Sequence, residues 1–192
     1  MSCGRLLLHE NGYICNSCQS AHHYFKQGRA ALLYEGDMRL ALFQLKFFNR
    51  RDHVEFFGTA MAACIASRLD DWRAQLILPV PMFRKKEKAR GFNQAELLAR
   101  EISRHTGIPY SKKYLKCEFQ SADQKMLTHA ERMRNLKGIF SVRDSFPQVK
   151  RVILVDDVYT SGATMDELAR TLLKVGVEEV YFVVLCIKRE AY

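Results

Sequence analysis

The chain has 192 residues, of which 48% are apolar and 27% charged, and its formal net charge is +9. This length predicts one domain with at most a small appendage, and this composition excludes a disordered chain. The longest run without charged or histidine residues, 56–67, is too short to cross a bilayer, which takes about 20 apolar residues. The start of the chain lacks the pattern of a secretion signal, so we expect the cytoplasm as its compartment.

The positive charge is concentrated in one stretch. Residues 81–140 carry fourteen basic and six acidic side chains, a net charge of +8, whereas 1–80 carries +2 and 141–192 carries −1. Such a stretch indicates an anionic partner or a solvated face. Aromatic residues interleave with the basic ones, as in proteins that bind single-stranded nucleic acid, although aromatics at such spacing are more often core residues.

The first half of the chain is predicted to be mainly helical. Residues 1–25 are rich in Cys and His and lack apolar periodicity. A short strand is predicted at 28–34. Two helices follow, at 38–48 with Asp37 as the N-cap and at 56–69.

The second half alternates strands with helices. Strands are predicted at 75–80, 114–115, 151–155 and 179–187, and helices at 93–105 and 163–174. Continuous apolar strands that alternate with helices favour a parallel α/β sheet covered by helices.

The strongest motif is the segment 152–164, VILVDDVYTSGAT. A buried strand ends there in Asp156 and Asp157, and a hydroxyl-rich loop with Gly162 leads into a helix. Ligands of parallel α/β sheets bind at the carboxyl ends of the strands, and a helix N-terminus suits a phosphate. The two acids would repel that phosphate, so their chemistry fits sugar hydroxyls or a metal bound alongside.

Each residue of this motif, taken singly, has an ordinary interpretation as part of a strand-end turn or a helix cap. Their order along the chain is what indicates a site. The two common glycine-rich phosphate loops, G-x-x-x-x-G-K-[ST] and G-x-G-x-x-G, do not occur in the sequence.

The segment resembles the phosphoribosyl pyrophosphate (PRPP) signature of type I phosphoribosyltransferases. The resemblance implies a Rossmann-like fold, a parallel sheet flanked by helices. It implies that Asp156 and Asp157 hold the ribose 2′- and 3′-hydroxyls. It implies a cradle for the 5′-phosphate, formed by Thr160, Ser161, Gly162, Ala163 and Thr164. Purine-salvage members carry an acid where this chain has Thr160, which argues against a 6-oxopurine acceptor.

Two further segments, 79–99 and 124–140, resemble the ComF family, whose R-G-F-N-Q run stands here at 90–94. Its members pair a type I phosphoribosyltransferase-like domain with an N-terminal zinc-binding segment and are linked to natural competence and DNA uptake. The resemblance implies a zinc-binding segment at 1–26 and the phosphoribosyltransferase-like domain at 27–192, with a helical hood within 27–70.

The basic segment 82–90 is predicted to be a loop. In the type I architecture this loop binds the pyrophosphate of PRPP, which comes with magnesium, and the resemblance gives that role to Pro81, Arg84 and Arg90. Cations and backbone N–H groups would stabilise the charge on the leaving group. For any single lysine of the segment, a solvated position is the simpler interpretation.

The polar stretch 118–137 is expected to be the mobile lid of the family, which closes over PRPP to exclude water. The family's Q-x-x-L…R-x-x-N pattern falls in it, at Gln124, Leu127, Arg132 and Asn135. A disordered loop would have the same polarity and length.

Three of the six cysteines cluster near the N-terminus. Cys15 and Cys18 form a C-x-x-C knuckle, and Cys3 resembles the end of another. Tetrahedral zinc takes four such ligands, and His22 or His23 can supply the fourth. ComF-like proteins have two C-x-x-C pairs, and the first cysteine of the first pair would lie just before Met1 here, either because the chain starts late or because that cysteine has been lost. A redox role or a chance spacing are the alternatives, but the thioredoxin context is missing.

Two functions follow from these patterns. One is transfer of a phosphoribosyl group from PRPP to a nitrogen acceptor, with magnesium and without a covalent intermediate. The other is a non-catalytic accessory of transformation that binds PRPP or single-stranded DNA alongside competence proteins. A PRPP-sensing regulator is a third option, and the fold alone does not choose among them.

Overall fold

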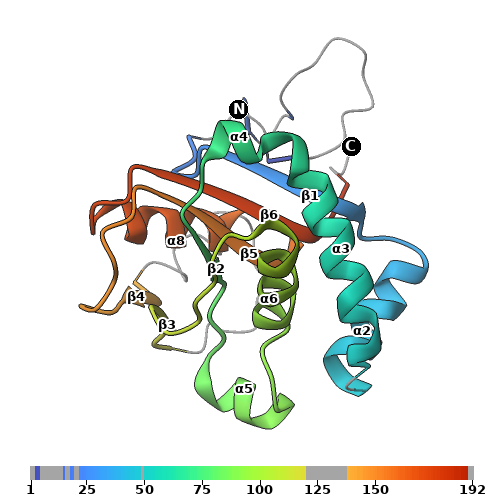
Figure 1. Ribbon diagram of the computed structural model, residues 1–192. Helices are drawn as coiled ribbons and strands as arrows, with labels where there is room; N and C mark the ends of the chain where they lie inside the picture. The colour runs from blue at the N-terminus through green and yellow to red at the C-terminus, as the bar shows by residue number, and fades with distance from the viewer. Residues whose placement is uncertain are drawn as a thin grey trace.

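The computed structural model describes residues 3, 4, 15, 18, 19, 22–48, 50–119 and 138–189 (Figure 1). Its strands and α-helices in chain order are β1 (Gln27–Leu33), α2 (Asp37–Phe48), α3 (Val54–Ile65), α4 (Leu69–Trp72), β2 (Leu76–Pro79), α5 (Arg84–Arg90), α6 (Gln94–Thr106), β3 (Leu115–Cys117), β4 (Phe140–Val142), β5 (Arg151–Tyr159), α8 (Ala163–Leu173) and β6 (Glu179–Ile187). Short 3₁₀ turns at Arg51–His53 and Ala66–Arg68 flank α3.

A parallel sheet forms the centre of the described fold, with its strands in the order β1-β6-β5-β2. The long pair β5 and β6 runs in register from Arg151 opposite Glu179 to Tyr159 opposite Ile187. Because all four strands are parallel, their carboxyl ends lie at one edge of the sheet. The arrangement confirms the predicted fold class, a parallel sheet flanked by helices.

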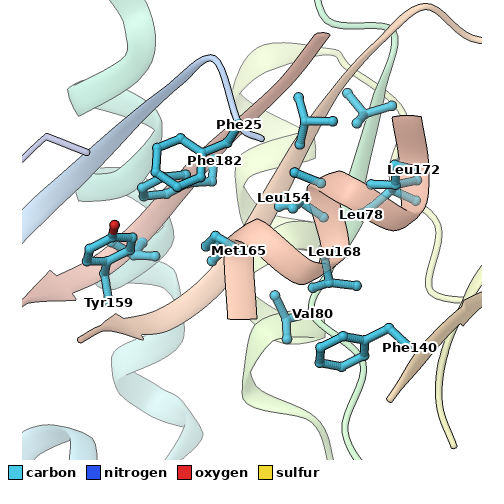
Figure 2. Packing of buried hydrophobic residues seen from close by; sticks show 14 of the residues in the cluster. Phe25, Leu78, Val80, Phe140, Leu154, Tyr159, Met165, Leu168, Leu172 and Phe182 are labelled. Atoms are coloured by element: carbon cyan, nitrogen blue, oxygen red, sulfur yellow. The ribbon is translucent and has the colours of Figure 1, made fainter. Parts of the chain in front are cut away.

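Two apolar layers cover the sheet. On one face, α8 and the β3–β4 hairpin pack on alternate residues of the central strands. Figure 2 shows Leu168 and Leu172 of α8 beside Leu78 and Leu154. The other face carries α2, α3 and α6, and it buries a separate cluster that includes the stacked Trp72 and Tyr181 rings, 4.6 Å apart. Successive residues of a central strand point alternately into these two apolar layers, so the whole strand is an unbroken apolar run.

Helix α6 begins where its sequence predicts, because Asn93 caps it. The Asn93 side chain accepts a hydrogen bond from the backbone N–H of Ala95 at 3.0 Å. Its amide nitrogen also donates to the backbone oxygen of Val80 at 2.9 Å. The helix ends at Gly107, which adopts the left-handed conformation, φ 72°. One side chain thus ties the start of α6 to the chain leaving β2, on the carboxyl edge.

Three predictions from sequence need correction. The basic segment predicted as a loop contains helix α5, Arg84–Arg90, because its Arg, Lys, Glu and Ala residues are strong helix formers and Gly91 ends it with φ 84°. Strand β5 does not stop before the acid pair but runs on to Tyr159. Strand β4 was not predicted, since three residues are too few to show a period of two.

Other predicted features are placed less fully. Strand β1 pairs with β6 in the main sheet, so the helical part of 27–70 begins at α2. The lid residues Gln124, Leu127, Arg132 and Asn135 lie outside the described residues. No helix in the described part of the chain has the length and apolarity needed to cross a membrane.

A matched pair of substitutions tests the two-layer core. Leu154 is 0% exposed and Leu40 is 56% exposed. We expect Leu154→Ala to lower the free energy of unfolding by about 2–5 kcal/mol through lost burial and a cavity. Leu40→Ala should change it by less than about 0.5 kcal/mol. Urea denaturation followed by circular dichroism measures both, and equal losses would contradict this packing.

Candidate functional site

The acid pair lies inside β5, near the carboxyl edge of the sheet. Asp157 is buried, with 5% of its surface exposed, whereas Asp156 is partly exposed. The backbone N–H of Asp157 donates to the Asp156 carboxylate at 2.8 Å. Burial, and after it the charge of Asp157, raise the pKa of Asp156 to about 7. Two acids held this close to an apolar core need positive charge nearby to remain ionised.

Lys46 of α2 supplies such a charge. Its Nζ lies 2.5 Å from Oδ2 of Asp157, and 23% of the lysine side chain is exposed. Burial lowers the pKa of Lys46, but its ion pair with Asp157 and the charge of Asp156 outweigh that effect and raise the pKa overall. The sequence analysis missed Lys46. The signal available was one cation in the last turn of an apolar helix, which is also an ordinary helix end.

Arg90 approaches the same pair from the end of α5. Burial lowers the pKa of Arg90, and the charge of Asp157 opposes that shift. Its guanidinium donates to the Gln94 side chain at 2.6 Å and lies 5.6 Å from the centre of the Phe47 ring. The structure therefore brings Arg90 toward the acid pair, as part of the group that includes Lys46.

The loop after β5 is shaped by an aromatic stack. The Tyr159 ring is buried and lies parallel to the Phe182 ring at 5.0 Å (Figure 2). Gly162 has φ 83°, and a Cβ at this position would lie 2.3 Å from the Tyr159 hydroxyl. Only glycine fits this turn.

Helix α8 starts directly after this glycine and is eleven residues long. Its first residue, Ala163, is buried, while Thr160, Ser161 and Thr164 are partly exposed. The first N–H groups of an α-helix have no carbonyl partner within the helix, and they carry the positive end of its dipole. The loop and helix start predicted to bind phosphate are therefore contiguous with the acid pair, at one edge of the sheet.

The three residues assigned to pyrophosphate lie at the two ends of α5, Pro81 and Arg84 at its start and Arg90 at its end. Pro81 and Arg84 line a cleft of about 960 Å³ between the start of α5 and the β3–β4 hairpin, together with Lys116 and Arg143. The residues lining this cleft do not include Arg90 or the acid pair. The sequence predicted these cations as one group, whereas helix α5 separates them.

Three cysteines of the N-terminal segment form a second candidate site. The sulfur atoms of Cys3, Cys15 and Cys18 all lie within 4.8 Å of one another, so the three can hold a metal ion. Contact with Cys3 lowers the pKa of Cys18 to about 3 despite burial, and His23 contributes to the shift. A thiolate is the form of cysteine that binds metals.

His23, not His22, adjoins this group. His22 is exposed and its ring meets Tyr24 edge-on. Nδ1 of His23 lies 2.6 Å from the Asp166 carboxylate, and its Nε2 is buried without a hydrogen-bond partner among the described residues. Burial lowers the pKa of His23, but contacts with Asp166 and Cys18 raise it to about 9. Metal-binding histidines are typically oriented by a carboxylate in this way.

Comparison with known proteins gives one matching domain family and several related proteins. Residues 88–192 match the model of the phosphoribosyl transferase domain family. The chain is 39% identical over 109 residues to Competence protein F of Haemophilus influenzae, a match that covers 55% of this chain and 47% of that protein. It is 29% identical over 194 residues to Competence protein ComFC of Bacillus subtilis, covering 91% and 78%. It is 31% identical over 157 residues to DNA utilization protein YhgH of Escherichia coli O157:H7, covering 80% and 68%.

The match to the Haemophilus protein therefore spans about half of that relative's length. Among solved structures, the fold is similar to a purine phosphoribosyltransferase from Pyrococcus horikoshii, with 17% identity and a TM-score of 0.44 over 70% of this chain and 73% of that one. The domain match contains β5, the acid pair, the glycine loop and α8. The chain belongs to the ComF family of competence-related proteins and carries its phosphoribosyl transferase domain.

Proposed function

We propose that the protein binds PRPP with magnesium at the carboxyl edge of the sheet, between β5, α8 and the hood helices α2 and α3. The observation that carries the proposal is the continuous unit of acid pair, left-handed Gly162 and helix start at the end of a central parallel strand. In such sheets the carboxyl edge is the usual place for a ligand.

Each part of this unit suits one part of PRPP. Asp156 and Asp157 accept hydrogen bonds from the ribose hydroxyls, which donate without bringing negative charge. The loop from Thr160 to Thr164 holds the 5′-phosphate, with backbone N–H groups and hydroxyls as donors and the dipole of α8 as an attractive field. Gly162 allows the close approach because it has no Cβ.

The leaving pyrophosphate requires positive charge. Arg90 is a cation whose charge interacts with Asp157, and Arg84 extends the positive surface along α5 toward the cleft. Magnesium, when bound with PRPP, would neutralise part of the phosphate charge, and the carboxylates of the acid pair are oxygen donors of the kind it takes. Gln124, Arg132 and Asn135 complete the proposal as lid residues.

The reaction in this proposal is displacement of pyrophosphate at C1 of PRPP by a nitrogen nucleophile. The residues named here position the sugar and stabilise the departing charge, and none forms a covalent bond to it. The acceptor enters from the side of the hood, where α2 carries its exposed aromatic residues.

A second candidate function is binding of single-stranded DNA without turnover. Helix α5 carries five basic residues and one acidic residue, and Arg84, Lys85, Lys86 and Lys88 are exposed. This density of exposed charge exceeds what one small ligand needs, and it suits a polyanionic strand. The relatives named for competence and DNA utilization support this candidate.

We further propose that segment 1–26 is a zinc-binding unit on the domain 27–192. Cys3, Cys15 and Cys18 provide three sulfur ligands, and the buried Nε2 of His23 is the fourth donor. Bound zinc would act structurally, by cross-linking Cys3, Cys15 and Cys18 to His23.

Binding of PRPP tests the first proposal. In calorimetric titrations with magnesium, we expect the parent protein to bind PRPP. The double substitution Asp156→Asn/Asp157→Asn should weaken binding at least tenfold, since hydrogen bonds to charged groups are worth about 1.5–3 kcal/mol. Asp144→Asn is the matched control, because Asp144 is an exposed acid outside the site. A parent protein that does not bind, or a double variant that binds equally well, would contradict the proposal.

Metal content tests the zinc proposal. Freshly purified protein should contain one zinc ion per chain by inductively coupled plasma mass spectrometry. Cys18→Ser and His23→Gln should each lose most of it, because each removes one of four ligands. His22→Gln should retain it. Zinc-free parent protein would rule out the site, and loss of zinc from His22→Gln alone would show that the wrong histidine has been assigned.

A further inference from the structure

Lys46 of helix α2 forms an ion pair with Asp157 and has no part in the function proposed above. We propose that Lys46 is a positioning residue of the sugar site, which holds helix α2 against Asp157 and thereby places the aromatic face of α2 beside the bound sugar. The part of this inference that concerns ligand rests on the proposed PRPP site. The part that concerns α2 stands without it.

The first support is the burial of the pair. Asp157 is 7% exposed at its side chain and Lys46 23%, and Nζ and Oδ2 are 2.5 Å apart. A charge at this depth is costly unless it is paired. Removal of one partner from a buried pair therefore destabilises more than the pair itself stabilises. Most other ion pairs of the described chain join side chains of which at least one is more than a third exposed.

The second support is how little of α2 is buried otherwise. Of its twelve residues, Leu42 and Leu45 are buried. Leu40, Phe43, Phe47 and Phe48 are between 49% and 66% exposed. Two leucines bury too little apolar surface to fix the direction of a three-turn helix, so a charged contact in its last turn has a large share in its position.

The third support is what adjoins Lys46. The next residue, Phe47, packs on Phe43 with ring centres 4.8 Å apart and lies 5.6 Å from the Arg90 guanidinium. Arg90 in turn feels the charge of Asp157. Lys46 thus pairs with Asp157, while its neighbour Phe47 contacts Arg90, whose charge acts on the same carboxylate, so a shift of Lys46 would disturb this whole group.

The ion pair with Lys46 leaves part of the Asp157 carboxylate available to bind a sugar hydroxyl. A carboxylate has about four acceptor positions, and one ammonium group occupies only part of them. The remaining acceptor positions of Asp157 are available to a ribose hydroxyl. The aromatic residues of α2 then border the side of the sugar from which a planar acceptor would approach, and such rings favour stacking.

The test compares two lysines of the full-length protein, each in an ion pair with the sheet. Lys46→Met removes the proposed anchor. Lys26→Met is the control, because Lys26 pairs with Glu179 near the opposite edge of the sheet and is 43% exposed. Hydrogen exchange read by mass spectrometry should show α2 amides exchanging about tenfold faster in Lys46→Met, as expected for a lost buried pair, with α6 unchanged. In Lys26→Met both helices should match the parent, since exposed pairs contribute little.

Further variants keep the test decisive. Lys46→Arg keeps the charge and should restore protection of α2. Asp157→Asn removes the other partner and should loosen α2 as Lys46→Met does, so it serves if Lys46→Met fails to fold. Equal α2 exchange in Lys46→Met, Asp157→Asn and the parent would overturn the anchoring role.

Calorimetry then tests the ligand part separately. If the parent binds PRPP, Lys46→Met should bind it about tenfold more weakly than Lys26→Met does. Faster exchange of α2 with unchanged PRPP affinity would overturn the positioning role and leave the proposed site intact. If the parent does not bind PRPP, the proposed function fails, while the exchange result still decides whether Lys46 anchors the hood.

Discussion

The described structure depends on how it accommodates negative charge at the end of a buried strand. Asp157 has an apolar strand before it and is itself buried. An isolated carboxylate there would be neutralised or expelled. Lys46 from α2 and Arg90 from α5 bring the compensating charge, so two helices from different parts of the chain supply positive charge to the acid pair.

Helix α8 connects this site to the cysteine cluster. Its start is set by Gly162 against Tyr159, whose ring stacks on Phe182 and meets Phe25 edge-on. One turn along, Asp166 accepts hydrogen bonds from the backbone N–H of Tyr24 and from the His23 ring when Nδ1 is protonated. His23 and Tyr24 therefore contact the helix whose first turn follows the Gly162 loop, which links the residues beside the cysteine cluster to that loop.

Most features that depend on local pattern were predicted from the sequence, whereas one local helix and the features decided by a long-range contact were missed. Strands β5 and β6 and the loop at Gly162 follow from apolar runs and residue order. The helix of α5 was missed because its charges suggested a loop, although the same residues favour a helix. Lys46 and the choice of His23 over His22 depend on partners more than a hundred residues away, Asp157 and Asp166. The spacing of residues along the sequence does not indicate contacts between residues so far apart.

The central claim is that the loop before α8 and the acid pair together bind a 5-phosphoribosyl group. Phosphorus-31 NMR of PRPP with magnesium tests it most directly, because the 5′-phosphate resonance is resolved from the two of the pyrophosphate. We predict that the protein shifts and broadens the 5′-phosphate resonance, and that Gly162→Ala abolishes this effect because its Cβ would displace the loop from Tyr159. A 5′-phosphate resonance that stays unchanged in the presence of the parent protein would contradict the account.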